Sequence, residues 1–205
     1  MTLKEFLFDQ YGYNEPISVD KIKFKNYSRS WIFKELRKLM DTGEIKRFSV
    51  GFYYFPKRMF FGDSYLDPRR VVERRFITDG SVVYGYISGI SLLNKTGLST
   101  QVPNLIELVT NNETTRVRDI NIGAQRVRVR SARTLITNEN VNTLQFLDLM
   151  NTIVPVNLGE TERYMLSKYI KASGITKAAV KQNLVFFPNR AAKNLLDSGA
   201  VYELA

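Results

Sequence analysis

The chain has 205 residues, a formal net charge of +10 and a sequence pI near 9.7, a balance that favours a polyanionic partner such as nucleic acid or an anionic membrane surface. It contains no Cys and no His, which excludes disulfides, thiolate nucleophiles, thiolate metal sites and the commonest general base. It has no apolar run approaching about 20 residues and no signal-peptide pattern, so we expect a cytoplasmic protein without a membrane partner.

Two short helices are predicted at the N-terminus. Thr2 is a good N-cap for a first helix in which Leu3 and Leu7 share one face, ending near Gly12. Ser18 is the expected N-cap of a second short helix. Three lysines that follow alternate with apolar residues and either skirt a phosphate backbone or only keep a loop soluble: Lys21, Lys23 and Lys25.

The stretch from Tyr27 to Pro56 predicts a basic amphipathic helix followed by a Gly turn and a β-hairpin. The apolar residues of the helix lie at helical spacing between Ile32 and Met40, and Gly43 ends it. Its opposite face is basic, and its N-terminal end is where the helix dipole favours phosphate. The candidate DNA-binding residues of this helix are Ser28, Arg29, Ser30, Lys34, Arg37 and Lys38.

Two β-prone runs, residues 44–48 and 52–55, form the predicted hairpin, and we assign Lys46 and Arg47 jointly to its DNA-binding wing. Eleven basic residues stand against three acidic ones between Lys21 and Arg58, so most of the excess charge lies here. Helices followed directly by such a hairpin are typical of a winged helix-turn-helix, which we predict over residues 1–60. The alternatives are a merely solvated helix and a winged helix that serves protein contacts.

A second domain of mixed α/β structure is predicted over residues 67–205, which makes the fold class α+β. Asp67-Pro68 is a strong helix start, residues 82–87 are β-prone, and residues 88–96 predict a helix closed by Gly97. From Asn140 onward the apolar spacing is helical.

A second hairpin is predicted from residues 116–122 and 125–130, which alternate apolar and charged residues around Gly123-Ala124. Its exposed face is expected to be basic and to bind a phosphate backbone or an acidic partner. The other interpretation is an edge strand kept soluble by charge. This second basic surface consists of Arg116, Arg118, Arg126, Arg128 and Arg130, with Arg133 beyond it.

Several short motifs, in the order seen here, make residues 17–135 resemble the AbiEi-type antitoxins, the transcriptional regulators of AbiE (type IV) toxin-antitoxin systems. Two departures are the residues at 94–96, where the family has small apolar side chains, and the absence of any familiar motif after residue 135. The motifs that carry the resemblance are Gly97-Leu98-Ser99-Thr100-Gln101-Val102-Pro103, the preceding Ser88-Gly89, the strand from Leu105 to Thr110, Gly43-Glu44-Ile45, Gly51 with Tyr53-Tyr54 and Pro56-Lys57, and Phe61-Gly62.

The resemblance implies a DNA-binding antitoxin that represses its own operon by binding inverted-repeat operator sites, with self-association of two copies on the DNA. It also implies that the C-terminal domain counteracts a neighbouring nucleotidyltransferase toxin without a stable complex, in the context of phage abortive infection. We accordingly expect no catalytic residue, no metal and no cofactor. From the residues alone, the run 97–103 is more readily explained as a tightly built turn than as a ligand site.

Two other function classes remain open. The C-terminal domain could be an enzyme or a nucleotide-binding modulator that modifies the toxin, using carboxylates such as Asp79, Glu107 or Asp119, although the sequence supplies no converging acid-base pair and no Gly-rich phosphate loop. An RNA-binding module would need exposed aromatic side chains beside the basic face.

Overall fold

A computed structural model describes all of residues 1–205, which combine helices and strands in two compact units. The first unit contains Met1–Arg75 together with Ile122–Gln125, and the second contains Phe76–Asn121 together with Arg126–Ala205. The sequence predicts domains of 1–60 and 67–205, whereas in the structure residues 67–75 belong to the first unit. None of the helices has the length and apolar character needed to cross a bilayer.

Helix α1 (Leu3–Tyr11) begins and ends as predicted. The Thr2 hydroxyl accepts a hydrogen bond of 3.2 Å from the backbone N–H of Glu5, and the Glu5 carboxylate accepts one of 2.8 Å from the N–H of Thr2. This capping box satisfies two backbone donors that the helix cannot pair internally. Leu3 and Leu7 are buried, which gives α1 one face in the core of the first unit.

The predicted second helix is wrong. Ile17–Ser18 form strand β1, Val19–Lys21 form a single 3₁₀ turn, and the Ser18 side chain makes no capping hydrogen bond. Ile17 lies opposite Tyr53 in an antiparallel ladder and is fully buried. Sheet pairing and burial of Ile17 therefore decide the conformation of a segment whose local sequence favours a helix start.

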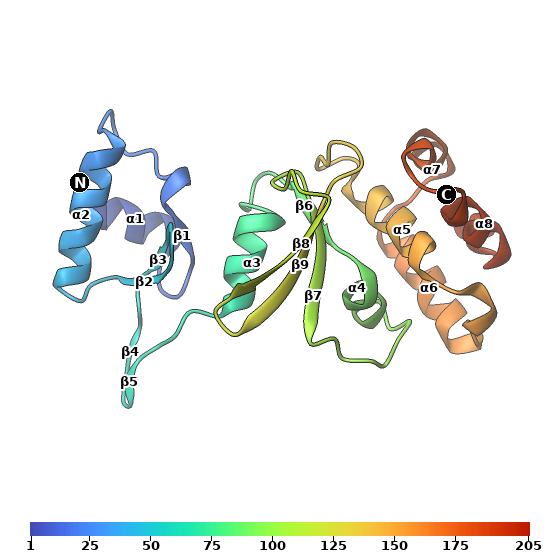
Figure 1. The fold of residues 1–205 in the computed structure, drawn as a ribbon, viewed down its shortest axis with the longest axis horizontal. Helices are drawn as coiled ribbons and strands as arrows, with labels where there is room; N and C mark the ends of the chain where they lie inside the picture. The colour runs from blue at the N-terminus through green and yellow to red at the C-terminus, as the bar shows by residue number, and fades with distance from the viewer. The chain divides into compact units, whose positions relative to one another are not determined.

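The next elements of the first unit follow the prediction: helix α2 (Arg29–Asp41), strand β2 (Lys46–Ser49) and strand β3 (Phe52–Tyr54). The three strands form an antiparallel sheet in the order β1-β3-β2 (Figure 1). Apolar side chains from both helices and the sheet make one core, consisting of Leu3, Leu7, Ile17, Val19, Ile22, Phe24, Ile32, Leu36, Ile45, Tyr53 and Phe55.

A second, two-stranded hairpin occupies the segment for which the sequence predicts only a connector. Strands β4 (Arg58–Met59) and β5 (Gly62–Asp63) pair, and Figure 1 shows them as a narrow ribbon extending from β3. Helix α3 (Pro68–Phe76) follows, and the backbone N–H of Arg69 donates a 2.9 Å hydrogen bond to the Asp67 carboxylate, as expected for the predicted cap. Arg70 of α3 forms an ion pair with Glu15, a contact internal to the first unit.

The second unit contains a four-stranded mixed sheet with the order β6-β7-β9-β8. β6 pairs antiparallel with β7, and β7 pairs parallel with β9 from Leu105 opposite Arg126 to Thr110 opposite Ser131. The predicted hairpin is confirmed as β8 and β9, and the predicted helix closed by Gly97 is confirmed as α4. The bounds are β6 (Gly85–Ile87), α4 (Gly89–Lys95), β7 (Leu105–Thr110), β8 (Val117–Ile122) and β9 (Gln125–Ser131).

Four helices complete the second unit: α5 (Val141–Thr152), α6 (Glu160–Ala172), α7 (Lys177–Asn183) and α8 (Asn189–Asp197), gathered at the C-terminal end in Figure 1. Helix α5 is the centre of this core, with a continuous buried run from Phe146 to Met150. The Asn194 side chain of α8 donates hydrogen bonds of 2.8 Å to the carbonyl of Met150 and 2.9 Å to that of Ile153, which joins α8 to the C-terminal end of α5.

Candidate nucleic-acid interface

Helix α2 presents the predicted division into an apolar and a basic face. Ile32 and Leu36 are buried, and Leu39 and Met40 are partly buried against the same core, so the predicted apolar face is confirmed. The Ser28 hydroxyl accepts a hydrogen bond of 3.3 Å from the N–H of Trp31, which confirms the N-cap. The candidate contact residues on the remaining surface are all exposed: Ser28, Arg29, Ser30, Lys34, Arg37 and Lys38.

Carboxylates already hold two of these cations. Arg29 forms an ion pair with Asp20, and Lys38 lies 2.5 Å from the Glu35 carboxylate one turn earlier on the helix. Lys34 and Arg37 have no carboxylate within ion-pair distance, and they lie three positions apart on the helix, where side chains are neighbours. These two residues are therefore the cations most available for phosphate on α2.

Lys46 and Arg47, the two residues of the predicted wing, also differ in whether a carboxylate pairs with them. Lys46 lies 3.0 Å from the Asp63 carboxylate of β5, and the hydrogen bond to Asp63 raises the pKa of Lys46 above its ordinary value. Arg47 is exposed, and its Nε donates a 3.4 Å hydrogen bond to the carbonyl of Ser49 across an irregularity in the β2–β3 register. Arg47 thus extends into solvent from a bulged strand, whereas Lys46 forms an ion pair with Asp63 of the β4–β5 hairpin.

An aromatic stack that the sequence reading missed lies at the N-terminal end of α2. The Tyr27 ring stacks on Trp31 with centroids 3.9 Å apart, and Phe24 stacks on Trp31 at 6.0 Å. Phe24 is buried, while Tyr27 is 45% exposed, and the Lys25 ammonium lies 5.8 Å from the Tyr27 ring. The signal in the sequence is the close spacing of three aromatic residues, of which Phe24 and Tyr27 precede the basic helix and Trp31 lies in its first turn. The stack fixes the N-terminal end of α2 and leaves one aromatic face beside cationic side chains.

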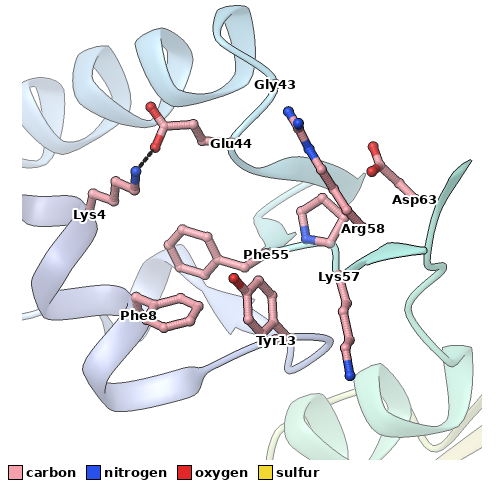
Figure 2. Close-up of a pocket in the computed structure, with 10 residues that line it drawn as sticks. Lys4, Phe8, Tyr13, Gly43, Glu44, Phe55, Lys57, Arg58 and Asp63 are labelled. Atoms are coloured by element: carbon pink, nitrogen blue, oxygen red, sulfur yellow. Dashed lines mark ion pairs between the residues drawn. The ribbon is translucent and has the colours of Figure 1, made fainter. Parts of the chain in front are cut away.

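A cavity of about 540 Å³ lies elsewhere in the first unit and is shown in Figure 2. Phe8 meets Tyr13 and Phe55 edge to face, with ring centroids 4.8 Å and 5.3 Å apart. Lys4 and Glu44 form an ion pair at its rim, and the hydrogen bond from Lys4 lowers the pKa of the Glu44 carboxyl. Lys4 and Glu44 therefore neutralise each other, and Asp63, the other acid of the lining, is paired with Lys46.

The sequence predicts a basic exposed face on the second hairpin, and in the structure carboxylates pair three of its five arginines. Arg118 Nε donates a 2.5 Å hydrogen bond to Glu113, and Arg128 makes a bidentate pair with Asp119 at 2.7 and 2.8 Å. Arg130 donates a 3.0 Å hydrogen bond to the buried carboxylate of Asp148. Glu113, which precedes the hairpin, and Asp119, which lies within β8, therefore form ion pairs with its arginines. Arg116 and Arg126 complete the set, and both are exposed.

The three carboxylates considered for enzyme chemistry are not assembled into one group. Asp79 accepts hydrogen bonds from the N–H groups of Ser81 and Val82 within a turn. Glu107 accepts a 3.3 Å hydrogen bond from the N–H of Ile90, and Asp119 pairs with Arg128 on the neighbouring strand. The structure contains no group of three or more His, Cys, Asp or Glu side chains that could hold a metal ion.

Comparison with protein-family models and with curated proteins returned no match. The AbiEi resemblance described from the motifs therefore stays a prediction, and so does the DNA-binding role of the residues on α2 and the wing.

Proposed function

We propose that the first unit is a winged helix-turn-helix that reads duplex DNA, and that the protein is an autorepressing antitoxin of a toxin-antitoxin operon. The observation that carries the proposal is the arrangement of α2: its N-terminus is capped, its apolar face is buried, and Lys34 and Arg37 are exposed without acidic partners. A capped basic helix can enter the major groove, where its N-terminal side chains contact base edges.

The sheet supports the same proposal. Strand β1 lies between α1 and α2 in the sequence and pairs with β3, which in turn pairs with β2. The β2–β3 hairpin that follows α2 is therefore hydrogen-bonded to β1. We infer a winged helix from this order of elements, with the 3₁₀ turn Val19–Lys21 in the place of a second helix. In a winged helix the hairpin contacts the DNA backbone beside the recognition helix. Arg47 is the wing residue best placed for such a contact, since Lys46 is held by Asp63.

Under this proposal the second unit opposes the nucleotidyltransferase toxin without a stable complex, and two copies of the chain bind the inverted repeats of the operator. The proposal also implies a cytoplasmic protein, because a repressor must share the compartment of its operator. It assigns no catalytic residue and no cofactor to the chain.

The test is binding of the full chain to a labelled duplex of its own upstream region and to a scrambled duplex, by fluorescence anisotropy at several salt concentrations. We expect tighter binding to the native duplex and a steep loss of affinity with salt. Replacing Lys34 and Arg37 by Ala should reduce the slope of log K against log salt by about 1.8, since each phosphate contact contributes about 0.9.

The matched control replaces Lys177 and Lys181 of α7 by Ala, which removes the same charge from exposed positions of the second unit. This control should keep the native slope. Equal weak binding to both duplexes, or an equal loss of slope in the two double variants, would overturn the proposal, because net charge alone would then explain the interaction.

A further inference from the structure

The second unit encloses a cavity of about 360 Å³ on which three arginines converge. Arg116 precedes β8, Arg130 lies on β9, and Arg133 follows β9. The apolar part of the lining comes from Val109, Val117 and Ala132, with the Tyr86 ring beside them. A cavity of this size lies at the small end of the range for ligand sites, which is about 300 to 1,000 Å³. It therefore suits a small molecule rather than a polymer.

A buried hydrogen-bonded cluster fixes one of these arginines. The Ser88 hydroxyl donates to the Asp148 carboxylate, and Arg130 donates to the Ser88 oxygen and, over 3.0 Å, to Asp148. The Asp148 side chain is 2% exposed and that of Arg130 is 28% exposed. Arg130 is therefore partly accessible, and its position is set before any ligand arrives. Its buried Nε atom has no hydrogen-bond partner.

The other two arginines are exposed, and no carboxylate pairs with either of them. The Arg133 guanidinium lies 5.6 Å from the centroid of the Phe187 ring, which supports the side chain without neutralising it. Asp148 is the only acid in the lining, so three cations face one carboxylate and two positive charges are left over.

Tyr86 adds a neutral donor to this site. Burial raises the pKa of its hydroxyl above the ordinary value, and the negative charge of Asp148 acts in the same direction, against the opposing effect of Arg130 and Arg133. A phenol is protonated at neutral pH even without this shift, so the Tyr86 hydroxyl can donate a hydrogen bond to an anion.

We propose that this cavity binds a small ligand that carries a phosphate monoester dianion, of the size of a nucleoside monophosphate. The excess of two positive charges matches a dianion. Planar guanidinium groups match the geometry of phosphate oxygens and bind them in pairs of hydrogen bonds. The apolar wall formed by Val109, Val117 and Ala132 accommodates the uncharged part of the ligand. This site goes beyond the proposed repressor, because no residue that lines it belongs to α2 or the wing.

The experiment is isothermal titration of the full chain with adenosine monophosphate, inorganic phosphate and adenosine. We expect the two phosphates to bind and adenosine to give no signal. Arg116→Gln and Arg133→Gln should each weaken binding at least tenfold, and both are exposed substitutions compatible with a native melting temperature. Arg190→Gln on α8 removes the same charge from an exposed position outside the cavity and should bind as the native chain does.

A pH series gives an independent readout. Binding of adenosine monophosphate should weaken as the pH falls below about 6, where a phosphate monoester becomes a monoanion. Absence of binding by both phosphates, or an equal loss in Arg190→Gln, would overturn the proposal. Displacement of adenosine monophosphate by a scrambled DNA duplex would also overturn it, since the arginines would then contact a nucleic-acid backbone. None of these results depends on whether α2 reads an operator, so the two proposals fail separately.

Discussion

Lys46 of β2 and Asp63 of β5 form an ion pair 3.0 Å long, which joins a predicted DNA-contacting lysine to a carboxylate. Asp63 holds the Lys46 ammonium in place, but it also places a negative charge where the proposed wing meets phosphate. We therefore expect Asp63→Asn to tighten binding of the operator duplex by about two- to fivefold, the range expected from removing one partly exposed charge pair. Anisotropy titrations at low salt measure the change.

The control for this prediction is Glu15→Gln, which also removes one negative charge from an ion pair of the first unit, that with Arg70. It should alter affinity less than Asp63→Asn does. If the gain depends on freeing Lys46, it should largely disappear when Asp63→Asn is made together with Lys46→Gln. An unchanged affinity in Asp63→Asn would mean that Lys46 does not contact DNA.

The Asp148 carboxylate is expected to be a main source of stability in the second unit. It is buried, and it accepts hydrogen bonds from Ser88 and Arg130. Asp148→Ala leaves the Arg130 charge without its partner, which costs about 3 to 5 kcal/mol in buried pairs. Urea unfolding followed by circular dichroism measures the loss, while fluorescence of Trp31, the only Trp of the chain, reports on the first unit.

The matched comparison is Asp119→Ala, which breaks the bidentate pair with Arg128. Both of those side chains are more than 40% exposed, so water and salt screen the pair. We expect the unfolding midpoint to move much less than in Asp148→Ala. Equal shifts in the two variants would contradict the structural role assigned to burial of Asp148.

Helix starts were predictable from sequence because their causes are local. Thr2, Ser28 and Asp67 each accept a hydrogen bond from a backbone N–H two or three residues later, and this spacing is visible in the sequence. Ser18 carries the same signal and does not cap a helix. Its neighbour Ile17 pairs with Tyr53, and no local pattern shows a partner that lies so far along the chain.

The two candidate sites also differ in whether local sequence or long-range contacts determine them. The basic face of α2 follows from helical spacing, so its exposed residues could be named in advance. The cavity could not, because Arg130 meets Ser88 and Asp148, which lie 42 and 18 residues away in the sequence. The spacing of charges on β9 predicts a strand with basic residues, but it does not indicate which of them a carboxylate will neutralise.

The Glu113 carboxyl should make stability depend on pH in the acidic range. Burial alone would raise its pKa, but the N–H of Thr115 and the Arg118 guanidinium outweigh this effect and hold the pKa below the ordinary 4.5. A group whose pKa is lower in the folded state stabilises that state above its unfolded pKa, and this stability is lost as the pH falls through the folded pKa. We therefore expect Glu113→Gln to be less stable than the native chain at pH 6 and to approach it below pH 4.5.

Urea midpoints of the two proteins between pH 6 and pH 3 test this prediction. Glu160→Gln is a suitable control, because it removes the same charge from an exposed position on α6 of the second unit. A Glu113→Gln variant whose deficit in stability stays constant across the whole range would show that the carboxylate acts through packing rather than through its charge.

Gly85 is predicted to be irreplaceable because of a close backbone approach in the second unit. A Cβ atom at this position would lie 1.9 Å from the carbonyl oxygen of Phe76 and 2.7 Å from that of Val109. Tyr86, the next residue along β6, lies opposite Val109 in the antiparallel β6–β7 ladder. The backbone at Gly85 therefore cannot move away from Val109 without breaking the pairing of β6 with β7. We expect Gly85→Ala to cost about 3 kcal/mol or more, at the upper end for overpacked sites.

Gly174→Ala separates steric clash from backbone strain. Gly174 has a φ of +60°, and a Cβ atom there would have no neighbour within 4 Å. The substitution therefore carries only the cost of a left-handed conformation, about 1 to 2 kcal/mol. Urea unfolding of both variants should place Gly85→Ala well below Gly174→Ala in stability. The reverse order would mean that β6 can shift away from Phe76, and that the β6–β7 register is less constrained than the contacts of Gly85 indicate.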